Sequence, residues 1–113
     1  MAFHIKKHFV NNMKISEFQK LMKELYYHQD SKRGIEKTFI WFIEEVGELA
    51  STLKNSSELD SKKISEEMAD IIAWMSSLAN LLEIDLEKAL FEKYPNKCIK
   101  CNSNPCCCSN TPK

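Results

Sequence analysis

Two short segments of this 113-residue chain hold acidic residues at spacings that could bind a metal ion. They are WFIEEVGELA at 41–50 and EEMADIIAW at 66–74. Residues three apart on a helix point the same way, so each segment presents one acidic pair at the margin of an apolar stripe. If the two helices pack antiparallel through these stripes, four carboxylates converge. The four side chains are Glu45, Glu48, Glu67 and Asp70.

Four converging carboxylates repel one another by several kcal/mol in total at an effective dielectric constant of about 20. Protonation or a bound cation makes such an arrangement tolerable. Ligands that are all oxygen favour a hard cation, Mg²⁺ or Mn²⁺. A solvated acidic flank is the alternative, since glutamates are common on exposed helices. A di-iron carboxylate site would need Glu-x-x-His pairs, and neither acidic helix has a histidine.

A tryptophan accompanies each acidic pair. Trp41 precedes Glu45 by four residues, and Trp74 follows Asp70 by four, so the second motif is the reverse of the first. In an antiparallel pair of helices both indoles then come to the same end of the acidic cluster. An aromatic surface beside divalent cations suits a nucleotide, which has a base to stack and phosphates to neutralise. Indoles that serve only as core residues are the alternative.

EEVGEL at 44–49, together with EEMADIIAW at 66–74, resembles the EExxE…ExxD signature of the MazG-like, all-α nucleoside triphosphate pyrophosphohydrolases. SKRGIEKTFIWFIEEVGELA and LANLLEIDLEKAL are similar to the flanking segments of archaeal-type members, so the resemblance covers about residues 16–95. It implies Mg²⁺-dependent hydrolysis of a (d)NTP to the monophosphate and pyrophosphate, as in house-cleaning of the nucleotide pool. A related alternative is a phosphoribosyl-ATP pyrophosphohydrolase. The metal ligands implied are Glu45, Glu48, Glu67 and Asp70.

The resemblance also suggests roles for other residues. Glu44 is the additional acid of EExxE, which could support the metal ligands, complete a further metal site or act as the base for the attacking water. Either Glu44 or Glu48 is the expected catalytic base. Many relatives carry an asparagine in a longer last helix, where this chain offers Lys93 before Tyr94-Pro95. The candidate substrate-binding residues are Trp41, Trp74, Lys32, Arg33, Lys37 and Lys93.

The elements that must position these residues read as helices, because the chain has only two glycines and three prolines. A capping box from Ser16 to Gln19 predicts a helix that ends near His28. Apolar periodicity predicts further helices over about 35–54 and 62–83, and a short one between Asp85 and Pro95. We therefore expect an all-α fold, an antiparallel bundle of three long helices and a short fourth in a single domain over 1–95.

The segment 96–113 contains all five cysteines and little that could form a core. Its Cys-x2-Cys and Cys-x-Cys spacings could supply the four ligands of a tetrahedral Zn²⁺ site, in which Cys107 is not a ligand. A flexible or oxidised tail is the alternative. Because no secretion signal precedes these thiols, we expect a reducing compartment, the cytoplasm. The candidate zinc ligands are Cys98, Cys101, Cys106 and Cys108.

Charge and size limit the partners. Sixteen basic and 16 acidic residues balance, so we expect neither nucleic-acid nor membrane binding. A bundle this small cannot bury all of its apolar surface within one chain. The resembled family forms dimers and tetramers, so we expect a homodimer or homotetramer with sites near the subunit interface. A non-enzymatic helical and zinc interaction module is the competing function. His4 and His8 are read as part of a basic arm.

Overall fold

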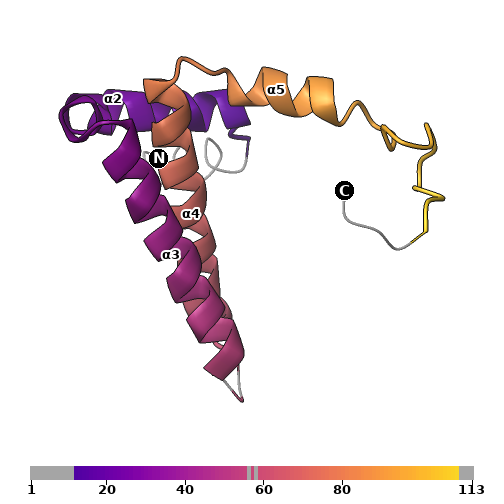
Figure 1. Ribbon diagram of the computed structural model, residues 1–113, viewed down its shortest axis with the longest axis horizontal. Helices are drawn as coiled ribbons and strands as arrows, with labels where there is room; N and C mark the ends of the chain where they lie inside the picture. The colour runs from indigo at the N-terminus through magenta and orange to yellow at the C-terminus, as the bar shows by residue number, and fades with distance from the viewer. Residues whose placement is uncertain (1–11, 56, 58, 110–113) are drawn as a thin grey trace, which may run out of the picture.

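The computed structural model describes residues 12–109 apart from 56 and 58, and this part of the chain contains four helices and no strand (Figure 1). The all-α prediction, with three long helices and a short fourth, is therefore confirmed. The basic arm with His4 and His8 lies outside the described residues. The helices are α2 (Ile15–Arg33), α3 (Ile35–Asn55), α4 (Ser61–Leu81) and α5 (Leu86–Lys93).

The predicted start of α2 is wrong in its capping residue. The N-cap is Lys14, and the Glu17 carboxylate accepts a hydrogen bond from the Lys14 N–H at 3.1 Å. The backbone N–H of Ser16 instead donates to the side chain of Glu87, at 3.2 Å. Gln19, expected to complete the capping box, is used in tertiary contacts. A capping pattern in the sequence cannot show which polar side chains the tertiary fold recruits.

The predicted end of α2 near His28 is also wrong, because the helix continues through the polar stretch to Arg33. Nothing between His28 and Arg33 breaks a helix. Gly34 does, with φ of +89° and ψ of +169°, a conformation that only glycine adopts readily. Its N–H donates to the carbonyl of Asp30 at 2.9 Å and so closes the last turn.

An aspartate caps each of the two later helices. Asp60 precedes α4, and its carboxylate accepts hydrogen bonds from the backbone N–H groups of Lys62 and Lys63. Asp85 precedes α5 and accepts from the N–H of Lys88. These bonds satisfy donors that have no partner inside the helix.

The helices α3 and α4 form a long antiparallel hairpin, and α2 crosses one end of it (Figure 1). At the crossing, α4 contributes a run of small or polar buried side chains, Ser76, Ser77, Ala79 and Asn80. Small side chains let helix axes approach closely, and Met22 of α2 is buried here. Met22 and Ala79 are the only hydrophobic residues classed as buried in the described part of the chain.

An amide pair ties α2, α4 and the turn before α5 together. Gln19 donates to the side chain of Asn80 at 3.1 Å and to the carbonyl of Ile84 at 2.7 Å. Asn80 in return donates to the Gln19 carbonyl at 3.1 Å, and the Leu86 N–H donates to the Gln19 side chain at 3.0 Å. Gln19 therefore helps to fix the position of α5 on α2, together with the bond from Ser16 to Glu87.

So thin a core leaves much apolar surface uncovered. The radius of gyration is 17.0 Å, against about 13 Å for a compact chain of about 100 residues. On α3, Phe42 and Leu49 are half-buried, but Phe39, Val46 and Leu53 are exposed, although all five lie on the side that the helical repeat makes apolar. Exposed residues on α4 include Met68 and Ile72, at 50% and 56%. The hairpin thus covers only one side of each apolar stripe.

No helix in the described part of the chain is long and apolar enough to cross a membrane.

Candidate functional site

The acidic segments of α3 and α4 face each other in the hairpin. Glu45 is half-buried on α3. Burial raises the pKa of its carboxyl above the ordinary value of 4.5, and so do the charges of Glu48, Asp70 and Glu67 and a hydrogen bond with Glu48. Glu48 lies one turn along α3, whereas the other two acids come from α4. The structure therefore brings all four acids into electrostatic contact around Glu45.

Glu67 is held in place by a residue that sequence reasoning missed. The Thr52 hydroxyl of α3 donates to one Glu67 carboxylate oxygen (Oε2) at 3.1 Å. The other oxygen, Oε1, is buried and has no hydrogen-bond partner. A buried carboxylate oxygen without a partner is unfavourable, and a bound cation is one partner that satisfies it. The all-oxygen donor set and this unpartnered atom fit Mg²⁺ or Mn²⁺.

The acids stand further apart than metal-bound oxygens do. Among the described residues, no three of these carboxylates bring oxygens within 4.8 Å of one another. Glu44 and Glu48, the two candidates for the catalytic base, are both exposed on α3.

The two tryptophans meet across the hairpin. Their ring centroids are 5.5 Å apart and their planes are nearly perpendicular, at 88°. The guanidinium of Arg33 lies 4.5 Å from the Trp41 ring centroid and 4.9 Å from that of Trp74. The Lys37 amine lies 5.5 Å from the Trp41 centroid. Cations therefore lie beside the indoles at the end of the hairpin near α2.

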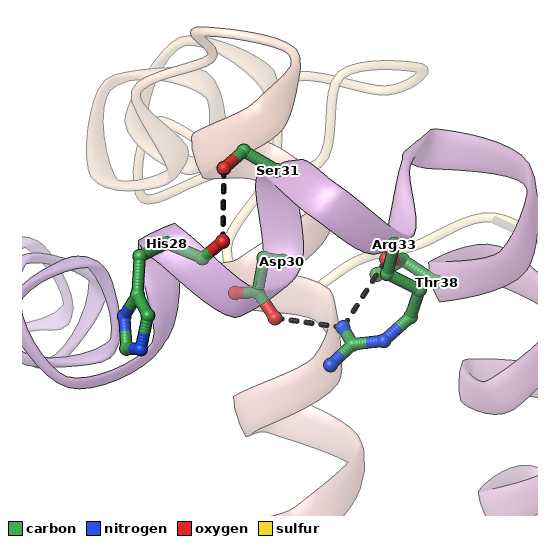
Figure 2. Close-up of polar contacts among 5 residues, drawn as sticks. All are labelled: His28, Asp30, Ser31, Arg33 and Thr38. Atoms are coloured by element: carbon green, nitrogen blue, oxygen red, sulfur yellow. Dashed lines mark hydrogen bonds and ion pairs between the residues drawn. The ribbon is translucent and has the colours of Figure 1, made fainter.

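Arg33 also contacts one side chain of its own helix, α2, and one of α3 (Figure 2). Its Nη1 donates to the Asp30 carboxylate at 2.7 Å and to the Thr38 hydroxyl at 3.4 Å. Asp30 is only 2% exposed, and Thr38 is fully buried. The charge of Arg33 is thus partly matched inside the protein. Asp30 and Thr38 were not predicted as part of the site, although an Asp–Arg pair at i, i+3 is visible once residues 28–33 are read as helix.

The predicted lysines are placed differently. Lys32 near the end of α2 and Lys37 near the start of α3 are both exposed, and of the two Lys37 is the one beside the Trp41 ring. Lys93 is the last residue of α5, which packs on α2 and points away from the hairpin (Figure 1). A single chain therefore does not bring Lys93 to the acidic residues.

A second cluster lies in the tail after α5. One sulfur from each of four cysteines lies within 4.8 Å of the others, an arrangement that could hold a metal ion. Hydrogen bonds, first from the backbone of Cys107, lower the pKa of the Cys101 thiol to about 5. Interactions with neighbouring thiols, first Cys106, raise the pKa of Cys108 to about 12. The members are Cys98, Cys101, Cys106 and Cys108.

The sequence model of the MazG nucleotide pyrophosphohydrolase domain family matches residues 33–102. The matched range includes both acidic segments, both tryptophans and the first two cysteines. No curated protein matches the chain.

Proposed function

Because this chain belongs to the MazG nucleotide pyrophosphohydrolase domain family, we propose that it hydrolyses nucleoside triphosphates to the monophosphate and pyrophosphate. The single observation that carries this proposal is the acidic cluster around Glu45, which joins the acids of both family motifs across one hairpin. House-cleaning of the nucleotide pool is the expected purpose. The four acids of that cluster are the proposed metal ligands.

The cation that fits this cluster is Mg²⁺ or Mn²⁺, which when bound would neutralise phosphate oxygens and lower the pKa of a coordinated water. The protein's own residues supply the rest. Thr52 orients Glu67 through its hydroxyl, so that the unpartnered oxygen of Glu67 remains available as a ligand. Glu44 or Glu48 accepts a proton from the water whose oxygen bonds to the α-phosphorus. The bond from the α-phosphorus to the bridging oxygen breaks, and that oxygen leaves as part of pyrophosphate.

The base of the nucleotide is proposed to bind at the end of the hairpin where Trp41 and Trp74 meet. Arg33 holds the two indoles in their perpendicular arrangement, and Lys32 and Lys37 offer positive charge for the phosphates. Lys93 reaches this region only if it comes from another copy of the chain. The exposed apolar side of α3 and α4 supports such a homodimer or homotetramer.

The test is pyrophosphate release from a panel of canonical and damaged (d)NTPs with Mg²⁺ or Mn²⁺. Glu45→Gln and Asp70→Asn should each abolish release, because each removes a negatively charged ligand. Glu24→Gln, an exposed acid on α2, is the matched control and should leave the rate unchanged. Full activity in the two site variants would refute the assignment, and activity confined to phosphoribosyl-ATP would identify the narrower enzyme instead.

A further inference from the structure

We propose that Cys98, Cys101, Cys106 and Cys108 bind one structural zinc ion, and that Cys107 between them is not a ligand. This site is separate from the proposed hydrolytic centre in its position, its ligand chemistry and its role.

The sulfur geometry matches zinc. All four sulfurs lie within 4.8 Å of one another, and those of Cys98 and Cys108 are 3.8 Å apart. A tetrahedral zinc site with Zn–S distances of about 2.3 Å has sulfur–sulfur edges of about 3.8 Å. A disulfide would need about 2.05 Å, and all five cysteines are free. The thiols are therefore spaced to share an ion.

The backbone around the first two cysteines is folded into a tight loop. The Asn102 N–H donates to the Cys98 carbonyl at 2.8 Å, and the Cys98 N–H donates to the Ser103 carbonyl at 2.9 Å. Asn102 adopts the left-handed conformation, with φ of +60°, that asparagine tolerates well. The Asn104 amide donates to the Asn96 carbonyl at 2.8 Å and ties the two ends of the loop together.

Backbone N–H groups point at the ligand sulfurs. The Cys107 N–H donates to the Cys101 sulfur at 3.4 Å, and the Cys108 N–H donates to the Cys106 sulfur at 3.3 Å. Such bonds stabilise thiolates and orient them toward a metal. Lys97 and Lys100 adjoin the first two ligands in sequence and offset the net negative charge of four thiolates with one Zn²⁺.

Cys107 differs from its neighbours. Its sulfur contacts the Ser103 hydroxyl at 3.6 Å instead of joining the four-sulfur group. Its contribution is the backbone N–H that supports Cys101, which any residue except proline supplies. This difference makes Cys107 an internal control for every experiment on the site.

The surroundings explain why a metal is needed. None of the described residues after α5 is buried, so this segment has no hydrophobic core of its own. It extends from the end of α5, away from the acidic hairpin (Figure 1). Small segments without a core are commonly held by a structural metal, and four thiolates select zinc where carboxylates select Mg²⁺.

The test is the metal content of the full-length protein, purified under reducing conditions and measured by inductively coupled plasma mass spectrometry. We expect one zinc per chain in the natural protein and in Cys107→Ser. Cys98→Ser, Cys101→Ser, Cys106→Ser and Cys108→Ser should each lose most of it. Retention of zinc by all four variants, its loss from Cys107→Ser, or iron in place of zinc would overturn the proposal.

Cobalt substitution tests the site without any mutation. Co²⁺ added to the natural, metal-stripped protein should give the visible spectrum of a tetrahedral tetrathiolate complex, and Zn²⁺ should displace it. A spectrum of octahedral Co²⁺ would refute the four-sulfur site. Both measurements can be repeated on Glu45→Gln, so a failure of the proposed hydrolase activity leaves the zinc result independent.

Discussion

Glu45→Gln should stabilise the metal-free protein while it removes the proposed activity. Glu45 is half-buried and faces three other carboxylates, so its negative charge opposes folding when no cation is bound. Glutamine has nearly the same shape and keeps a polar end, but it carries no charge. The substitution therefore isolates the electrostatic cost of the acidic cluster from its packing.

The expected gain is about 1–2 kcal/mol. Two like charges 4 Å apart repel by about 1 kcal/mol in water and about 4 kcal/mol at an effective dielectric constant of 20. The Glu45–Glu48 pair within one helix costs only a few tenths of a kcal/mol, and solvent screens the exposed partners. For a chain of this size, the gain corresponds to a Tm increase of roughly 3–10 °C.

The same interaction fixes the sign of the pH dependence. The pKa of Glu45 is higher in the folded protein than in the unfolded chain, so the folded state binds this proton more tightly. This group therefore costs no stability below about pH 4.5, and its cost grows as the pH rises through the folded-state pKa. The stability difference between Glu45→Gln and the natural protein should widen over that interval.

Thermal unfolding in a chelator, followed by circular dichroism between pH 4 and 8, measures both effects. Glu24→Gln serves as the control and should change Tm little at any pH. Excess Mg²⁺ should raise the Tm of the natural protein more than that of Glu45→Gln, because a ligand that binds the folded state stabilises it. A Glu45→Gln protein that is no more stable than the natural one in chelator at neutral pH would refute the reasoning.

Three further substitutions test the framework around the site by urea unfolding. Gln19→Ala should lower the free energy of unfolding by about 2–3 kcal/mol, because the side-chain oxygen of Asn80 and the backbone N–H of Leu86 then lose their hydrogen-bond partner. Arg33→Ala should cost about 3–5 kcal/mol, since it leaves the Asp30 carboxylate buried without its cation. Gly47→Ala should increase stability by about 0.5–1 kcal/mol, because an added Cβ in this helix interior meets no atom within 4 Å.

The first two of these substitutions have controls on the same helix. Lys20→Ala and Lys32→Ala change exposed neighbours on α2 and should alter stability by less than about 0.5 kcal/mol. Adding Asp30→Asn to Arg33→Ala should recover part of the lost stability, because it removes the unpaired charge. No recovery in the double variant, or a destabilised Gly47→Ala protein, would contradict the contacts described above.

The sequence alone was sufficient to predict four helices, although not the cap or the end of α2, and to pair the two acidic motifs. Periodicity and the caps at Asp60 and Asp85 are local features, so they survive in the folded chain unchanged. The reversal of the Trp and acid spacings requires an antiparallel hairpin before both indoles can meet, and they do meet. The four-cysteine group was likewise visible from spacing alone.

Only the tertiary structure decided which partners those residues take. Arg33 was predicted as a substrate-binding residue from its type alone, and only the structure shows that α2 continues to Arg33 and places Asp30 beside it. Gln19 was predicted to complete a capping box, but its side-chain amide forms hydrogen bonds with Asn80 of α4 and with the backbone N–H of Leu86. Nothing in the sequence indicated a role for Thr52, because its hydrogen-bond partner Glu67 lies 15 residues away on another helix.

The apolar periodicity of α3 likewise identified a stripe without showing which part of it would be covered. Phe42 and Leu49 pack in the hairpin, while Phe39 and Val46 stay at the surface. Hydrophobic patterns follow from the helical repeat of 3.6 residues, which the local sequence contains in full. Burial and partner choice follow from how the helices pack against one another, which depends on contacts between residues far apart in the chain.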